Sequence, residues 1–153
     1  MSGAGAVAGA VPGGRVAERQ MQVRWSDGDP LGHVNNAVYL TYLESARGGL
    51  VEDAVGVGEW ENWILARIEI DFLREISIRV KEVTVRCVVL RIGNSSVRTR
   101  DEAVLPDGTV AARAESVIVV RNRETGKPRP ITETERAALG RYLVAEDEPS
   151  PSV

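Results

Sequence analysis

Residues 25–48 read WSDGDPLGHVNNAVYLTYLESARG, and they set two aspartates, the only histidine and two adjacent asparagines directly before an apolar segment. Asparagine is a preferred N-cap residue, so the asparagines are suited to begin a helix. The following apolar residues recur at helical spacing: Val38, Tyr39, Tyr42, Leu43, Ala46 and Leu50. This pattern predicts a helix over residues 36–54 that is largely enclosed by protein. Gly48 and Gly49 weaken it locally, which indicates a close contact there.

Strand patterns occupy much of the remaining sequence. Residues 21–25 alternate loosely and indicate a short first strand, whereas residues 64–73 alternate cleanly between apolar and charged. The strand pattern continues over residues 75–80 and 82–92, with a bulge or bend between them near Lys81 and Glu82. Two more strands, residues 95–105 and 109–121, are joined by a hairpin at Pro106-Asp107-Gly108. Thr132 and Glu135 form a capping box before a short helix over residues 135–143.

The order of these elements predicts the fold class. A strand, a long helix, four strands and a short helix do not alternate as the elements of a parallel α/β sheet do. An α+β fold, in which one curled antiparallel sheet wraps around the long helix, accounts for this order. The predicted domain covers residues 19–143, between a disordered Gly/Ala-rich leader at 1–18 and a disordered acidic tail at 144–153. The exposed edge of such a sheet favours a symmetric dimer.

Composition restricts the class of function. The chain has 153 residues, a net charge of −3 and no run of basic residues, which disfavours nucleic acid as a partner. No apolar run approaches the roughly 20 residues that span a bilayer, so no membrane association is expected. The single cysteine, Cys87, excludes an internal disulfide and fits a reducing, cytoplasmic setting. With one histidine and one cysteine the sequence offers no zinc ligand set, so no metal is expected.

The segment before the long helix favours carboxylate chemistry. Nucleophile-elbow, P-loop and dinucleotide-binding motifs are absent from the sequence. The first amides of a helix have no intrahelical acceptors and carry partial positive charge, so they suit a polarised carbonyl oxygen. Asp29 could attack an acyl carbon beside them or activate water to do so. The simpler interpretations are a turn-forming Asp27, a hydrogen-bonded loop His33 and a plain helix cap at the asparagines.

The same segment resembles a known family. Residues 27–36, DGDPLGHVNN, match the D-x-D-x-x-G-H-V-N-N form of hotdog-fold acyl thioesterases, specifically the 4-hydroxybenzoyl-CoA thioesterase-like group. Residues 39–47 are similar to that family's central helix, and the stretches ARIEIDFLREI, IGNSSVRTRDEAV and TGKPRPI are similar to its later segments. The resemblance covers about residues 20–142. It implies a hotdog fold, in which a curled antiparallel sheet surrounds one central helix.

The resemblance also implies an activity, the hydrolysis of an acyl-CoA to a carboxylic acid and free CoA. Asp29 matches the family's catalytic aspartate, which acts as nucleophile or general base. A backbone amide near Asn36 matches the donor to the thioester carbonyl, and His33 matches a histidine that assists catalysis in related acyl-carrier-protein thioesterases. The resemblance implies no metal or bound cofactor. It implies a homodimer or homotetramer, with each acyl site between two subunits.

Substrate recognition is less specified by the sequence. Asn35, Arg74, Ser96 and Arg98 are candidates for binding the substrate, including its pantetheine or phosphates, and solvated surface positions are an equal alternative for the last three. Where many relatives have FLRP and a Gly-Asp turn, residues 72–75 read FLRE, which alters the loop expected near the ligand entrance. Two other functions stay open: an acyl-carrier-protein thioesterase, and an acyl-CoA-binding hotdog protein without catalysis.

Overall fold

The computed structural model describes residues 14–145, so most of the predicted leader and tail lies outside the described residues. The elements follow in the order β1 (Ala17–Gln22), the 3₁₀ turn η1 (Trp25–Asp27), α1 (Asn36–Ala54), the 3₁₀ turn η2 (Glu59–Asn62), β2 (Trp63–Phe72), β3 (Glu82–Ile92), β4 (Ser96–Val104), β5 (Val110–Val120) and α2 (Glu133–Gly140). The long helix therefore has the predicted bounds, and four strands follow it as expected.

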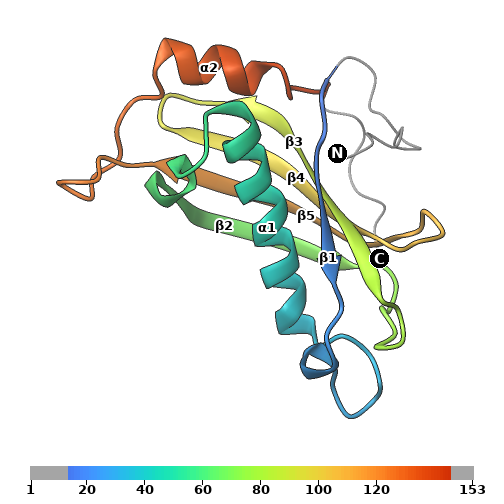
Figure 1. Cartoon of the computed structure of the whole chain (residues 1–153). Coiled ribbons are helices and arrows are strands. Elements are labelled where there is room, and N and C mark those ends of the chain that lie inside the picture. The colour runs from blue at the N-terminus through green and yellow to red at the C-terminus, as the bar shows by residue number, and fades with distance from the viewer. Residues whose placement is uncertain (1–13, 146–153) are drawn as a thin grey trace.

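All five strands join one antiparallel sheet in the order β1-β3-β4-β5-β2. Figure 1 shows α1 lying across one face of this sheet, with β1 and β2 at the two edges. The sheet curls around the helix, which confirms the predicted α+β hotdog architecture. The hairpin between β4 and β5 also forms as predicted, because Gly108 adopts a φ of +87° and Leu105 N donates to Thr109 O.

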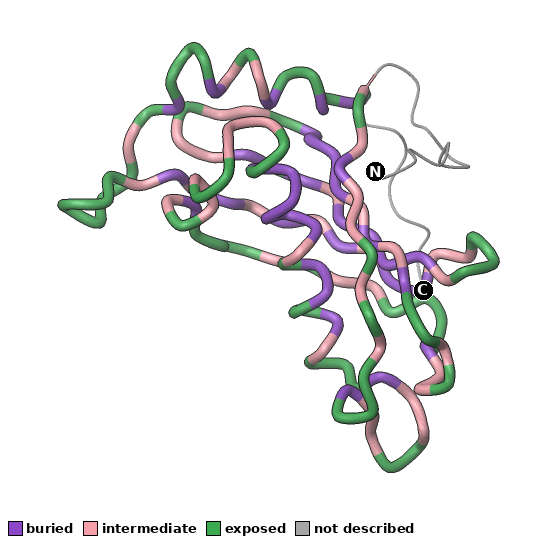
Figure 2. The backbone as a smooth tube through the Cα atoms, viewed as in Figure 1, coloured by how far each residue is buried: buried purple, intermediate pink, exposed green. Residues whose placement is uncertain are grey.

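The core lies between α1 and the concave face of the sheet. Tyr42, Leu43, Ala46 and Leu50 of the helix are at most 1% exposed, as their helical spacing predicts. Alternate residues of the central strands meet them, and Figure 2 shows this burial along α1 and the middle of the sheet. Burying these side chains and their strand partners supplies the main hydrophobic stabilisation of the fold.

The glycine pair in α1 marks two close contacts, as the sequence indicates. A Cβ atom built on Gly48 would lie 3.6 Å from the Trp60 indole. One built on Gly49 would lie 2.9 Å from Cζ of Arg19, closer than atoms normally approach. The missing side chains therefore let β1 and η2 approach opposite sides of the same helical turn.

Two strand predictions are wrong. The first strand covers Ala17–Gln22 rather than residues 21–25. Residues 75–80 form no regular strand, because their backbone groups bond to the loop before α1 instead of to the sheet. Val144, assigned by prediction to the tail, is buried and its amide donates to Val89 O at 2.9 Å.

Candidate active site

The segment between η1 and α1 folds into a small closed loop. Gly28 and Val34 form a β-bridge, and Asp29 N donates to His33 O at 2.8 Å. Gly32, at the tip, has a φ of +78°, a left-handed conformation that glycine adopts without strain. The loop therefore places Asp29 and His33 opposite each other on two short, paired backbone segments.

Asp29 is half-buried, and its side chain is fixed within the loop. Its Oδ1 accepts hydrogen bonds from Leu31 N at 2.9 Å and from His33 N at 3.2 Å. Both bonds use the same oxygen, so Oδ2 takes part in neither. The loop thus holds one carboxylate in a defined orientation, which is what a catalytic carboxylate requires.

The helix that follows begins with partly unsatisfied amides. Asn35 is the N-cap: its side-chain oxygen accepts from Ala37 N at 2.9 Å and its carbonyl accepts from Val38 N at 2.9 Å. The Asn36 amide, at the first helical position, has no intrahelical acceptor. Asn35 is therefore a true cap, and the Asn36 amide is the first-turn donor that is suited to an oxyanion.

The residues after β2 run alongside this loop. Val34 N donates to Ile76 O at 2.8 Å, and Ile78 N donates to Gly32 O at 3.0 Å. His33 Nε2 lies 3.2 Å from a carboxylate oxygen of Glu75, and about a third of the His33 side chain is exposed. The structure thus groups His33 and Asp29 with Glu75, a residue 42 positions from His33 that the sequence analysis notes only as a departure from the FLRP pattern.

Arg74 lies beside the same group. Its carbonyl oxygen is 3.4 Å from the Tyr39 hydroxyl, near the start of α1, and its side chain is exposed. Of the candidates for substrate binding outside the loop, only Arg74 has its backbone next to Glu75 and Tyr39. Its guanidinium is close enough to the β4–β5 hairpin to add to the effect of the Thr109 amide, which lowers the pKa of Asp107 there.

Ser96 and Arg98 lie at the other end of the sheet. Ser96 is paired with Val119 of β5, whereas Phe72, which packs against Tyr39 of α1, is paired with Ala112. Seven residues of extended strand separate the two positions on β5, or about 23 Å. Arg98 also points to the convex face, where its Nε donates to Glu115 at 3.1 Å. A single protomer does not bring these two residues together with Asp29.

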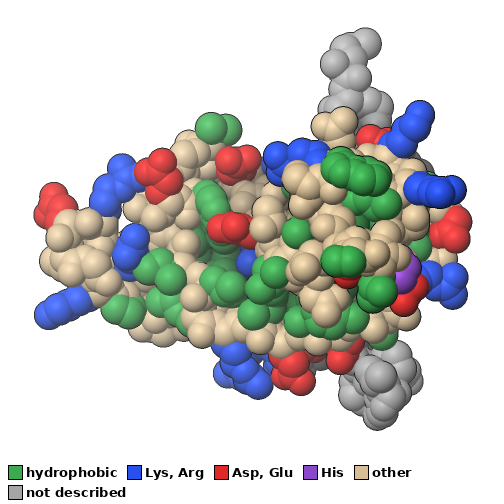
Figure 3. Space-filling view, turned by 90° about the horizontal axis from the view of Figure 1, so that it is seen from below, with side chains coloured by type: hydrophobic (Ala, Val, Ile, Leu, Met, Phe, Trp, Pro, Cys, Tyr) green, Lys and Arg blue, Asp and Glu red, His purple; other side chains and the backbone are tan. Residues whose placement is uncertain are grey.

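Apolar side chains surround the loop and the start of α1. Leu31 is 78% exposed, and Phe72 and Leu40 are more than 40% exposed. The Phe72 ring meets the Tyr39 ring edge-on at 5.2 Å between centroids. Figure 3 views the molecule from this end, and hydrophobic side chains gather across the middle of the face with charged side chains around them. Such a surface suits an apolar ligand group or another subunit.

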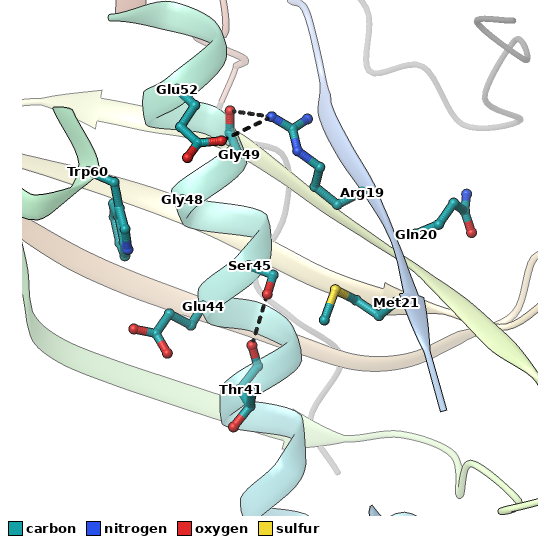
Figure 4. A pocket seen from close by; sticks show the side chains of 10 residues that line it. All are labelled: Arg19, Gln20, Met21, Thr41, Glu44, Ser45, Gly48, Gly49, Glu52 and Trp60. Atoms are coloured by element: carbon teal, nitrogen blue, oxygen red, sulfur yellow. Dashed lines mark hydrogen bonds and ion pairs between the residues drawn. The ribbon is translucent and has the colours of Figure 1, made fainter. Parts of the chain in front are cut away.

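A separate groove of about 450 Å³ runs along the outer side of α1. Figure 4 shows Trp60 on one side of the helix and Arg19 and Met21 of β1 on the other. Arg19 is fixed there, since its Nη2 lies 2.7 Å from Asp53 and 3.3 Å from the Gly49 carbonyl. The sequence analysis missed this groove because it placed the first strand four residues too late, and the residues AERQMQ of β1 have no apolar alternation that would have revealed it.

The part of the chain that the structure describes contains no cluster of three or more histidine, cysteine or carboxylate side chains that could hold a metal ion. Nor does any helix between residues 14 and 145 combine the length and apolarity needed to cross a bilayer.

Known proteins share this architecture. A family model described as the thioesterase-like superfamily matches residues 23–139. A Thermus thermophilus thioesterase, solved with coenzyme A and zinc, is 33% identical over 84% of this chain and 98% of its own, with a TM-score of 0.72. A predicted thioesterase from Bacillus stearothermophilus is 26% identical over 87% of this chain and all of its own, with a TM-score of 0.77.

A Staphylococcus aureus protein in complex with CoA shares the fold, at 16% identity over 92% of this chain and 90% of its own, with a TM-score of 0.74. Among curated proteins, none matches the chain significantly. The loop that precedes α1 lies entirely inside the region that the family model matches.

Proposed function

The chain belongs to the thioesterase-like superfamily and is a thioester hydrolase, and from this premise we propose that it hydrolyses acyl-CoA to a carboxylic acid and free CoA. The observation that carries the proposal is the Asp29 carboxylate, oriented by two amides of its own loop directly before the capped N-terminus of α1. The Thermus relative, solved with coenzyme A, supports CoA as the thiol half of the substrate.

The proposed reaction begins at the thioester carbonyl. In one route the Asp29 carboxylate takes a proton from water, whose oxygen adds to the carbonyl carbon; in the other, the carboxylate itself adds to that carbon. In both routes the carbonyl oxygen becomes an oxyanion that accepts from the Asn36 amide, a donor worth about 3 kcal/mol in comparable sites. The carbon–sulfur bond then breaks, and the sulfur leaves as a thiolate that takes up a proton. The first route releases the carboxylic acid directly, whereas the second leaves an acyl anhydride on Asp29 that water then opens.

His33 has an assisting role in this scheme. Its backbone amide donates to Asp29 Oδ1, and its ring is held beside Glu75 at 3.2 Å. The ring is partly exposed, so it can exchange protons with solvent and deliver one to the leaving thiolate. His33 thereby has two functions in the proposed mechanism: its backbone amide orients the Asp29 carboxylate, and its ring supplies a proton to the leaving thiolate.

Substrate binding is proposed to involve two subunits. Asn35 lies at the loop and the backbone of Arg74 contacts Tyr39 of α1, whereas Ser96 and Arg98 lie at the opposite end of the sheet. A second copy of the chain would bring its own Ser96 and Arg98 toward this loop if the two sheets met antiparallel along one edge. Among the described strands, β2 pairs on one side only, and Ile64 and Leu65 on it are about 40% exposed, which supports a homodimer through that edge.

The experiment measures thiol release from a panel of aliphatic and aromatic acyl-CoA thioesters, with the wild type, Asp29→Ala and Asp29→Asn. Cys87 is fully buried and therefore does not contribute to a native-state thiol readout. We expect kcat to fall at least about 100-fold in both variants, with little change in the melting temperature. Equal rates for the wild type and both variants would reject the role of Asp29.

Two further arms separate the alternatives. Acyl groups carried on an acyl carrier protein, tested beside the acyl-CoA panel, show whether the thiol donor is CoA or the carrier. Calorimetric titration with a non-hydrolysable acyl-CoA thioether detects binding without turnover. Tight binding combined with no hydrolysis of any thioester would favour a binding protein over the enzyme proposed.

A further inference from the structure

Asp27 is a buried carboxylate that the proposed mechanism does not use. Its side chain is 6% exposed, although it lies only two residues from the half-buried Asp29. Aspartate is seldom buried unless its oxygens are paired, so this burial needs a structural cause. Its hydrogen bonds supply that cause and point to a function.

The carboxylate of Asp27 joins the loop to the helix. Oδ2 accepts from the Tyr42 hydroxyl at 2.7 Å and from Arg24 N at 2.8 Å. Tyr42 lies in the second turn of α1 and is 1% exposed. Burial, together with the hydrogen bond to Asp27, raises the pKa of the Tyr42 phenol, so the hydroxyl keeps its proton and remains the donor.

The backbone of Asp27 holds the other end of the same loop. Its carbonyl oxygen accepts from Asn35 N at 2.8 Å, directly at the N-cap of α1. One residue therefore contacts the helix at its first turn through the main chain and at its second turn through the side chain. The next residue along the chain, Gly28, forms the bridge with Val34 that closes the loop around Asp29.

We propose that Asp27 is a positioning residue, which, through its bond to Tyr42, fixes the distance between the Asp29 carboxylate and the Asn36 amide. This inference rests on the proposed function, because it assumes that the carboxylate and the amide act on the same thioester. The reacting groups must be placed to within a fraction of an ångström, and a displacement of about 1 Å can cost about 100-fold in rate. A short, buried and charge-assisted link is suited to that precision.

The test compares Tyr42→Phe, Asp27→Ala and Asp27→Asn with the wild type, well below every variant's melting temperature. We expect kcat to fall about 10- to 100-fold in Tyr42→Phe and Asp27→Ala, with KM changed less than about threefold. Asp27→Asn should recover most of the activity lost in Asp27→Ala, because the amide oxygen can accept from both Tyr42 and Arg24. Tyr142→Phe, which removes the hydroxyl of a buried tyrosine beyond α2, is the matched control.

A second readout does not depend on catalysis. The backbone amide resonances of His33, which bonds to Asp29, and of Asn36 should shift in Tyr42→Phe and stay in place in Tyr142→Phe. If Asp29→Ala is fully active, the catalytic proposal fails and the positioning role fails with it, and shifted amides then show only that Tyr42 orders the loop. If Asp29→Ala is inactive while Tyr42→Phe keeps wild-type kcat and unshifted amides, the positioning role is overturned alone.

Discussion

Arg47 and Asp101 form an ion pair inside the core, with Arg47 Nη1 and Asp101 Oδ2 2.8 Å apart and both side chains at most 2% exposed. The pair joins the middle of α1 to β4. Asp101 also accepts from Ser116 Oγ at 2.6 Å and from Thr99 Oγ1 at 2.8 Å. Arg47 is less completely satisfied, since its Nε is buried without a partner in the described part of the chain. The two members of the pair therefore differ in what each loses when the other is removed.

Removing the carboxylate should destabilise the fold more than removing the guanidinium. Asp101→Ala leaves a buried cation with one weak contact to Ser116 at 3.3 Å, and we expect a loss of about 3–5 kcal/mol in the free energy of unfolding. Arg47→Met leaves a carboxylate that still has neutral donors, with an expected loss of about 1–3 kcal/mol. Urea unfolding of both variants measures the difference. A larger loss in Arg47→Met would contradict the assignment of Arg47 as the less satisfied partner.

Two buried acids predict a loss of stability at alkaline pH. Burial raises the pKa of the Cys87 thiol well above its ordinary value of 9.0, and burial raises that of the Tyr42 phenol above 10.0. The unfolded chain therefore releases these protons at lower pH than the folded chain does. The resulting stability is fully present below about pH 9 and is lost as the pH rises through the folded values.

Urea unfolding between about pH 8 and pH 11 measures this effect as a falling free energy of unfolding. Cys87→Ala and Tyr42→Phe should each make the fall less steep, because each removes one group that must stay protonated. A free energy of unfolding that falls equally steeply in the wild type and in both variants would assign the alkaline loss to other groups.

The adjacent glycines of α1 should respond differently to alanine. At Gly48 a methyl group would meet Trp60 at an ordinary 3.6 Å, so the helical preference of alanine should stabilise the protein by about 0.5–1 kcal/mol. At Gly49 the methyl group would lie 2.9 Å from Cζ and 3.1 Å from Cγ of Arg19, so that side chain must move. Gly49→Ala should therefore gain less or lose stability. Thermal unfolding compares the two, and equal gains would show that Arg19 moves at no cost.

The long helix and the following sheet could be predicted because their patterns are regular. Asn35 begins the helix, and the apolar spacing from Val38 to Leu50 fixes its buried face. The first strand could not be placed correctly, because its helix-facing positions are Ala17, Arg19 and Met21, which do not alternate apolar with polar. Arg19 is stable on that face because its guanidinium donates to Asp53 and to the Gly49 carbonyl. These contacts are tertiary and cannot be predicted from the local sequence.

The candidate site likewise has a part that the sequence predicts and a part that depends on tertiary contacts. Asp29 and His33 are close in sequence, so a short loop was enough to bring them together. The contacts that Tyr42 and Glu75 make with Asp27 and His33 are tertiary, so no local sequence pattern predicts them. Ser96 lies at the far end of the sheet, paired with Val119, so a single chain does not group it with Asp29.

The exposed edge of β2 predicts a dimer that can be broken by charge. We expect the wild type to have the mass of at least a dimer by light scattering, and the double substitution Ile64→Lys, Leu65→Lys to shift it to the monomer with loss of thioesterase activity. Gln22→Lys, on the exposed opposite edge strand β1, is the matched control and should leave the mass unchanged. A wild type that is monomeric and fully active would reject an active site shared between subunits.

The N-caps of the two helices provide a matched pair that separates stability from catalysis. Asn35 Oδ1 accepts from Ala37 N at 2.9 Å, and Thr132 Oγ1 accepts from Glu135 N at 3.1 Å. Replacing either cap with alanine removes one side-chain acceptor, so each variant should lose about 1 kcal/mol of stability. Only Asn35→Ala also disturbs the first turn of α1, where the proposed oxyanion donor lies, so it should lower kcat/KM while Thr132→Ala does not.

Steady-state kinetics and urea unfolding of these two variants measure both quantities on the same preparations. Asn35→Asp restores a side-chain acceptor for Ala37 N, so it should recover the stability. It also places a negative charge beside the amide that must receive an oxyanion, so kcat should stay low although the helix is capped. If Asn35→Asp regains wild-type kcat together with its stability, the start of α1 acts only as a scaffold, and the oxyanion donor must lie elsewhere.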